Sequence, residues 1–341
     1  MLVIGLVLAL GLPAATVGVR HVQGEGDSPG PGHLAPDHSI SALPATATVT
    51  PGSSGSASPV VTDQKAKKPG KRKPARRPAV KPPVKPSPAF PDATNTGVPR
   101  GTRLTRYTGD CVIWRANTVI DAKDVRCQLI VVAPGVRITR SRVDGGVDLE
   151  GKGSLVISDS EIIAPPDGTG VGDWNFTVLR SNLWGGKRQV NCYDNCVVRD
   201  SWIHGTRFTG ATHSGGMRAG MHTTYVHNTV VCDSPDSPQD GGCSADITMY
   251  GDFSTVHDVR IEHNLFKATP GGFCAYGGST PGKPYPDAHH VVFVDNVFEK
   301  AGRPCGIWGA IRDFDIHAPG NGWSGNVWSD GRPVPAPQTL S

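Results

Sequence analysis

Cationic and proton-transferring side chains gather between residues 204 and 290 of this chain. The set comprises two cations, three groups able to transfer a proton and two carboxylates: Arg218, Lys283, His213, Tyr250, Tyr285, Asp246 and Asp252. A cation can neutralise a bound carboxylate, and a histidine or tyrosine can move a proton, so this set could catalyse proton transfer on an anionic substrate. Two carboxylates could instead hydrolyse a glycosidic bond, provided that the turn after Tyr250 brings Asp246 and Asp252 onto one face.

Each of these residues also has a purely structural interpretation. Arg218 could form an ion pair with Asp246, His213 could hydrogen-bond its own loop, and Asp252 could cap the turn Gly251-Asp252-Phe253. The sequence leaves both interpretations open, so the elements that position these residues have to be found first.

Three long insertions carry or flank the candidate residues, namely His204–Gly215, Cys232–Ser244 and Gly277–His290. Long loops on a rigid scaffold are where binding and catalytic sites are usually built. We therefore expect a site where these insertions meet the scaffold.

The scaffold is indicated by a recurring short phrase with an apolar-x-apolar stretch, two residues, a Ser or Asn, and a second apolar stretch. The polar residue recurs at intervals of 19, 21, 20, 27, 36, 32 and 30 residues: Ser141, Ser160, Ser181, Ser201, Asn228, Asn264, Asn296 and Asn326. A period near twenty with insertions is typical of a solenoid, and the alternation within each phrase predicts strands. The Leu-x-x-Leu-x-Leu pattern of leucine-rich repeats is absent.

A Ser or Asn that recurs at one bend of every coil can bond to its equivalents in the coils before and after it. This phrase resembles the coils of the right-handed parallel β-helix superfamily that contains pectate lyases, polygalacturonases, alginate lyases and alginate epimerases. The resemblance covers roughly residues 117–328. It implies an all-β, right-handed parallel β-helix of about eight coils, and it is specific for the fold but not for a reaction.

The strand that precedes each phrase would form the first sheet of the solenoid. In the last coil this strand would be residues 306–308, with Ile307 pointing inward. Alternation along these strands places polar and aromatic side chains on its outer face, among them Asn191, Arg218, Asp246, Tyr250, Tyr276 and Trp308. Tyr250, Tyr276 and Trp308 could form a platform for sugar rings or an ordinary aromatic stack that supports the sheet. Arg188, His204 and Tyr285 are further candidates for substrate binding.

The resemblance implies lyase or epimerase chemistry, in which a base removes the proton next to a uronic carboxylate. Arg218 or Lys283 would then neutralise the carboxylate, His213 or Lys283 would be the base, and Tyr250 or Tyr285 the acid. The chain lacks the polygalacturonase elements Asn-Thr-Asp, Gly-Asp-Asp and Gly-His-Gly, and the pectate-lyase Arg-x-Pro-x-x-Arg. Pectin is therefore not predicted as the substrate. A glycoside hydrolase and a non-catalytic module that binds glycan or cell wall remain the alternatives.

The first part of the chain differs in composition from the rest. Residues 1–19 are apolar and predict a signal peptide or a membrane anchor, and residues 20–89 form a Ser/Pro-rich and then Lys/Arg/Pro-rich linker that we expect to be disordered. The basic run from Lys65 to Lys85 is either a tether to an anionic cell envelope or a solvated spacer. The predicted solenoid domain spans residues 90–341.

The remaining composition limits partners and cofactors. After Phe90 the chain has 23 basic and 26 acidic residues, so we expect no nucleic-acid binding. The eight cysteines all follow residue 110 and form close pairs, namely Cys111/Cys127, Cys192/Cys196, Cys232/Cys243 and Cys274/Cys305. This pattern predicts disulfides in a secreted or surface-anchored monomer. We predict no cofactor and no structural metal. A Ca²⁺ site among the Asp residues is left open, although no acidic loop of the EF-hand type is present.

Overall fold

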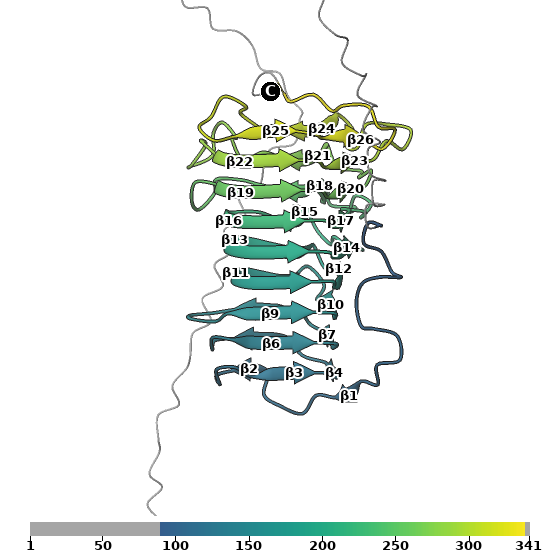
Figure 1. Ribbon diagram of the computed structural model, residues 1–341, viewed down its shortest axis with the longest axis vertical. Coiled ribbons are helices and arrows are strands. Elements are labelled where there is room, and N and C mark those ends of the chain that lie inside the picture. The colour runs from purple at the N-terminus through teal and green to yellow at the C-terminus, as the bar shows by residue number, and fades with distance from the viewer. Residues whose placement is uncertain (1–88, 338–341) are drawn as a thin grey trace, which may run out of the picture. The chain divides into compact units, whose positions relative to one another are not determined.

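The computed structural model describes residues 89–337, and every regular element in this part of the chain is a β-strand (Figure 1). The predicted N-terminal apolar segment and the predicted linker up to residue 88 lie outside the described residues. Within the described part, no helix is long and apolar enough to cross a membrane.

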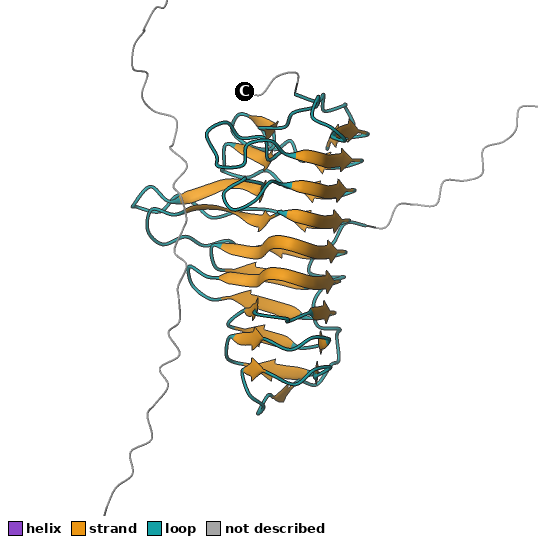
Figure 2. Cartoon of the chain, turned by 90° about the vertical axis from the view of Figure 1, so that its left-hand side faces the viewer, coloured by secondary structure: helices purple, strands orange, loops and turns teal. Residues whose placement is uncertain are grey.

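The described strands form two parallel sheets, of 16 and 10 strands, that wind around one core (Figures 1 and 2). The 16-stranded sheet bends into two faces, which we call the first and second sheets, and the 10-stranded sheet is the third. The first sheet contains β2 (Val112–Ile113), β5 (Leu129–Val131), β8 (Val147–Leu149), the start of β11 (Thr169–Leu179), the start of β13 (Arg188–Arg199), β15 (His213–Arg218), β18 (Gly242–Thr248), β21 (Phe273–Tyr276) and β24 (Gly309–Arg312). The second sheet contains β3 (Val119–Asp121), β6 (Val136–Thr139), β9 (Leu155–Ser158), the ends of β11 and β13, β16 (Met221–Val226), β19 (His257–Glu262), β22 (His289–Val294) and β25 (Gly322–Ser324).

The third sheet completes each coil. It contains β1 (Thr105–Arg106), β4 (Lys123–Val125), β7 (Arg142–Asp144), β10 (Glu161–Ala164), β12 (Asn182–Gly185), β14 (Trp202–His204), β17 (Thr229–Val230), β20 (Leu265–Phe266), β23 (Val297–Phe298) and β26 (Val327–Trp328). Residues 89–337 thus form a parallel β-helix of nine coils, which confirms the predicted fold class with one coil more than expected.

The core is a set of apolar columns that run along the solenoid. On the first sheet Val171, Val190, Met217 and Ile247 occupy equivalent positions in successive coils, and all four are fully buried. Because each coil repeats the same inward positions, one buried side chain rests on its equivalent in the neighbouring coil. This continuous core fixes the outward residues at regular spacing.

The predicted Ser/Asn ladder is present at the bend between the second and third sheets. The backbone N–H of each ladder residue donates to the side-chain oxygen of the next, from Ser141 to Ser160 at 3.1 Å through to Asn296 to Asn326 at 3.0 Å. The residue before each ladder position adopts a left-handed backbone, for example Arg180 with φ 46° and His227 with φ 53°. The ladder bonds help to offset the cost of that conformation.

The four predicted cysteine pairs are disulfides, and the described residues contain no free cysteine. Cys192–Cys196 lies inside the core where β13 passes from the first to the second sheet. Four disulfides in one domain indicate folding in an oxidising environment.

The last coil departs from the expected register. We expected the first-sheet strand at residues 306–308 with Ile307 inward, but β24 begins at Gly309 and Ile307 is 49% exposed. Ala275 pairs with Ile311, which takes the inward position, while the backbone N–H groups of Ile307 and Trp308 donate to the loop carbonyls of Gly271 and Gly272. The loop bonds hold residues 307 and 308 outside the sheet.

Candidate functional site

The outer face of the first sheet carries a row of polar side chains. Asp148, Asn191, Arg218 and Thr248 lie in one register column that crosses β8, β11, β13, β15 and β18, with Gly172 as its member on β11. The glycine leaves a low point in this row between Asp148 and Asn191. We call this row, with the loops that border it, the first-sheet strip.

Arg218, Asp252 and Lys283 form a charged cluster at one border of the strip. Arg218 ends β15 with its side chain 9% exposed, and its Nη2 donates to Asp252 Oδ2 and to the carbonyl of Tyr250, both at 3.0 Å. Lys283 Nζ, from the insertion that follows β21, lies 2.9 Å from Asp252 Oδ1. One carboxylate therefore holds both cations in place.

Gly251 explains how the two loops of this cluster meet. The backbone N–H of Tyr285 donates to the Gly251 carbonyl at 3.0 Å, and a Cβ at residue 251 would lie 1.8 Å from the Tyr285 carbonyl oxygen. Only glycine allows this close approach. The contact sets Asp252 beside Lys283, although the exposed Tyr285 side chain takes no part in it.

The rings of Tyr250, Tyr276 and Trp308 lie in one aromatic cluster, which Phe273 completes; we keep the name aromatic platform for these four side chains. The rings of Tyr250 and Tyr276 are 5.3 Å apart, and Phe273 bridges Tyr276 at 5.9 Å and Trp308 at 5.7 Å. Trp308 is 53% exposed, so its face is open to a ligand. Burial raises the pKa of the Tyr250 hydroxyl well above its usual value and also raises the pKa of Tyr276.

A second polar group on the strip was missed by the sequence analysis. Burial is the main cause that raises the pKa of Asp148 to about 6, and the negative charge of Asp173 adds to the effect. Burial likewise raises the pKa of Asp173, against a 2.6 Å hydrogen bond from Asn191 Nδ2 and the nearby charges of Arg188 and Arg218. Arg188 Nη1 donates to Asn191 Oδ1 at 3.1 Å.

One sequence signal could have identified Asp148. It stands between Val147 and Leu149, both buried, so the alternation of β8 already directs its carboxylate outward. Asp173 had no such signal, because the register between β11 and β13 shifts at residues 173 and 174.

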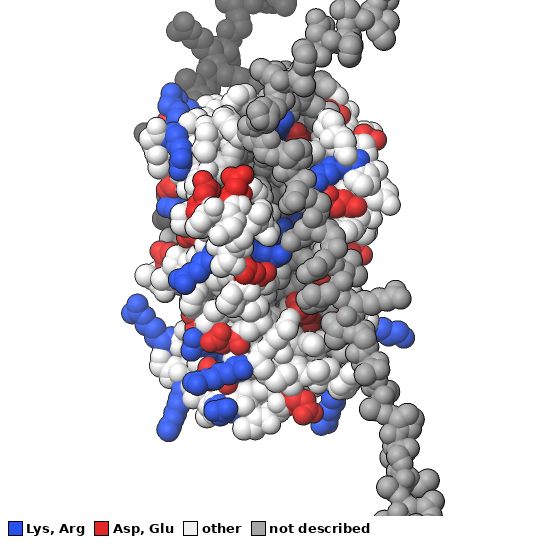
Figure 3. All heavy atoms as spheres, turned by 180° about the vertical axis from the view of Figure 1, so that it is seen from behind, with Lys and Arg blue, Asp and Glu red and all other residues white. Residues whose placement is uncertain are grey.

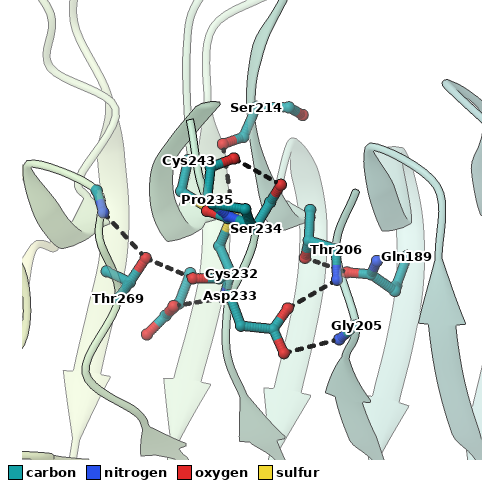
Figure 4. The surroundings of a disulfide bond; sticks show 12 residues. Gln189, Gly205, Thr206, Ser214, Cys232, Asp233, Ser234, Pro235, Cys243 and Thr269 are labelled. Carbon is teal, nitrogen blue, oxygen red and sulfur yellow. Dashed lines mark hydrogen bonds between the residues drawn. A yellow bond between two sulfur atoms is a disulfide. The ribbon is translucent and has the colours of Figure 1, made fainter. Parts of the chain in front are cut away.

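The loops on the opposite border of the strip are anchored to their neighbours (Figure 4). Asp233 accepts the backbone N–H groups of Gly205 and Thr206 at 3.1 and 2.8 Å, and the Thr269 hydroxyl donates to the Cys232 carbonyl at 2.6 Å. The Cys232–Cys243 disulfide closes the same loop, as predicted. Bonds to the preceding and following coils therefore fix this border.

Four expected site residues lie apart from the charged cluster. Asp246 is fully buried, where its Oδ1 accepts the Cys232 N–H at 2.8 Å and burial raises its pKa well above the usual value, so it is not on the exposed face and does not pair with Arg218. His204 ends β14 on the third sheet, where its ring stacks on Trp202 and bonds Asn182. The exposed His213 side chain has no hydrogen bond or ion pair to the described residues, and Tyr285 points to solvent.

The outer face of the second sheet has a hollow that is lined by few ionisable groups. Arg137 is the only charged residue among those that line it, and the polar remainder consists of groups such as Asn175 and Asn195, which hydrogen-bond each other at 2.8 Å. The first-sheet strip is therefore the better candidate.

Comparisons with protein-family models, with curated proteins and with solved structures found no match to this chain.

Proposed function

We propose that this protein is an exported carbohydrate-active enzyme that binds a polysaccharide along the first-sheet strip and acts on it by lyase or epimerase chemistry. The observation that carries the proposal is the convergence of Arg218, Tyr250, Asp252 and Lys283, which come from a strand and two loops far apart in sequence. The resemblance to the pectate-lyase-like superfamily supports the same substrate class.

Within the cluster, Arg218 is the candidate for neutralising the uronic carboxylate, Lys283 in its neutral form is the candidate base that takes the proton, and Tyr250 is the candidate acid. Arg218 Nε is buried and has no hydrogen-bond partner among the described residues, so the guanidinium keeps a donor that its protein neighbours do not use. Tyr250 keeps its proton because burial raises its pKa, so its hydroxyl is present as a donor, although the raised pKa makes it a weaker acid than a free tyrosine. A substrate carboxylate would compete with Asp252 for Lys283 and Arg218.

Glycoside hydrolysis is the second candidate, and the Asp148–Asp173 pair favours it. Asp148 has a pKa of about 6 and can hold a proton in mildly acidic solution, whereas Asn191 and two arginines favour the ionised form of Asp173. A protonated and an ionised carboxyl close together are the acid and base of that reaction. The same pair offers the oxygen ligands that a Ca²⁺ ion would prefer.

The protein should be incubated with uronate-containing and neutral polysaccharides, with and without Ca²⁺. Ultraviolet absorbance of unsaturated sugar and the release of reducing ends are recorded together. We expect Arg218→Gln to lower the rate of unsaturated product formation by about 10²-fold or more, because the site loses its buried cation. Arg260→Ala, which removes an exposed arginine of the second sheet, serves as the matched control.

The outcomes separate the three hypotheses. Reducing ends without absorbance, abolished by Asp148→Asn or Asp173→Asn, would replace the lyase with a hydrolase. Binding without any product, and without exchange of the uronate proton with solvent deuterium, would identify a non-catalytic glycan-binding module and reject the enzyme proposal. Equal activity of Arg218→Gln and Arg260→Ala would remove Arg218 from the site.

A further inference from the structure

A cluster of histidines and aspartates lies at the bend between the first and second sheets. His222 begins the second-sheet part of its coil on β16, His257 and Asp258 belong to β19, and His290 belongs to β22. The register of these strands places His222, Asp258 and His290 at equivalent positions in three consecutive coils, and His257 opposite His289. The cluster is thus produced by the solenoid repeat, from residues 68 positions apart.

The side chains face one another around Asp258. Asp258 Oδ2 lies 3.7 Å from His222 Nε2 and 2.8 Å from His257 Nδ1, and its Oδ1 lies 3.6 Å from His290 Nδ1. In a tetrahedral zinc site with bonds of about 2.0–2.1 Å, neighbouring ligand atoms lie about 3.3 Å apart. The separations from the two Asp258 oxygens bracket that value, and the ligand atoms of His222, His257 and Asp258 all lie within 4.8 Å of one another. Side-chain rotations would bring these three groups around one ion.

Asp194 prepares His222 for this role. His222 Nδ1 lies 2.7 Å from Asp194 Oδ1, and the carboxylate holds the ring proton on that nitrogen. The lone pair of Nε2 is then directed toward Asp258. A carboxylate behind the non-ligating nitrogen of a histidine is a common feature of metal sites, because it fixes the ring and its tautomer.

We propose that His222, His257 and Asp258 bind a Zn²⁺ ion, with His290 as a fourth ligand. The donor set of imidazole nitrogens and one carboxylate suits Zn²⁺ and related transition metals, and it does not suit Ca²⁺ or Mg²⁺, which prefer oxygen ligands. The ligand groups are reachable, since His222, Asp258 and His290 are exposed and His257 is partly exposed. The ion links three consecutive coils at the bend between the first and second sheets.

The test uses the untagged full chain with its disulfides formed, freed of metal by dialysis against a chelator. Zn²⁺ is titrated by calorimetry, and thermal unfolding is measured with and without the ion. We expect one Zn²⁺ ion to bind per chain, and His222→Ala and Asp258→Asn each to weaken its affinity tenfold or more. Zn²⁺ should raise the Tm of the unmodified protein and leave the Tm of both variants unchanged. His213→Ala, an exposed histidine at the start of β15, is the matched control and leaves both readouts unchanged.

The variant Asp194→Asn tests whether Asp194 orients His222 without binding the ion itself. It should weaken Zn²⁺ binding less than His222→Ala while leaving the stoichiometry at one. The inference is overturned if the double variant His222→Ala/His257→Ala binds Zn²⁺ as the unmodified chain does, or if Ca²⁺ raises Tm as much as Zn²⁺. Circular dichroism of each metal-free variant confirms that a lost site is not a lost fold.

Discussion

Asp148 and Asp173 are carboxyl groups on neighbouring coils, and their surroundings differ in how strongly they stabilise the ionised form. Asp148 has burial and two nearby carboxylates, Asp173 and Glu150, which all oppose ionisation, with only a hydrogen bond from Gln128 in its favour. Burial also raises the pKa of Asp173, but Asn191 and the charges of Arg188 and Arg218 oppose that rise by stabilising the anion. In a pair of carboxyls, a difference of this kind lets the group with the higher pKa act as the acid and the other as the base.

The raised pKa of Asp148 gives a prediction for stability. A carboxyl whose pKa is raised in the folded state binds a proton more tightly there, so its contribution to stability is lost as pH rises from the unfolded value near 3.8 through about 6. Asparagine does not ionise, so Asp148→Asn avoids this fall in stability with rising pH. We expect the variant to gain about 1–2 kcal/mol of unfolding free energy over the unmodified protein between roughly pH 4 and roughly pH 7.

Chemical unfolding of both proteins across that pH range measures the difference directly. A difference in unfolding free energy that stays constant with pH would show that Asp148 titrates normally. Gln128 can still donate to the side-chain oxygen of an asparagine at residue 148, so the hydrogen bond between the two coils is retained in the variant.

At this scale the sequence predicted part of the candidate site. Arg218, Tyr250, Asp252 and Lys283 were identified because they flank the insertions, and the structure brings them together. The loop contact at Gly251 that joins them is a backbone interaction between two loops, and neither loop sequence indicates its partner. Asp246 was misplaced because its carboxylate is covered by the loop that begins at Cys232.

The bends of the solenoid are the elements that hold the coils in register. Asn264 shows how: its Oδ1 accepts from the Asn228 N–H and its Nδ2 donates to the Tyr225 carbonyl, at 3.0 and 2.9 Å. Its own N–H donates to Asn296. One buried side chain therefore satisfies two backbone groups of the preceding coil, at positions that water does not reach.

Asn264→Ala should lower the unfolding free energy by about 2–4 kcal/mol, because it leaves the Asn228 N–H and the Tyr225 carbonyl buried without partners. Asn264→Ser should cost less, since serine holds the equivalent ladder position at Ser201 and keeps the acceptor. Urea unfolding of the two variants gives the comparison. Equal stability of the alanine and serine variants would mean that the ladder adds nothing beyond filling space.

The ladder also explains how far the fold could be predicted. Ser141 to Asn326 mark one bend in each coil, so the strands on either side of that bend follow from their spacing. The first-sheet strands lie further from this marker, beyond loops of variable length. In the last coil the loop before Gly309 contains no marker, and the prediction was three residues early.

On the scale of the whole domain, the first described residues pack against the bend that carries the Ser/Asn ladder. The Phe90 ring stacks on His227 and His263, with centroids 5.6 and 5.4 Å away, and the Gly97 N–H donates to the Arg180 carbonyl at 3.0 Å. These contacts place the start of the described chain on the bend between the second and third sheets. The start of the described chain therefore does not border the first-sheet strip, which is flanked by the loops described above.

Charge is spread over the domain rather than gathered into one field. Basic and acidic side chains are interspersed on the face seen from behind (Figure 3). Because the domain has a slight excess of acidic residues, an anionic polymer would have to be held by local cations such as Arg188, Arg218 and Lys283. The absence of nucleic-acid binding stays a prediction.

The central claim is that a polysaccharide binds along the first sheet. Retention in native gels cast with each polymer of the panel tests it, whether or not the bound sugar then reacts. We expect Trp308→Ala to reduce retention about tenfold, because the exposed end of the aromatic platform is lost. Trp114→Ala removes another exposed tryptophan, beyond the end of β2, and should leave retention unchanged. Equal retention of the two variants, or no retention of the unmodified protein by any polymer, would contradict the account.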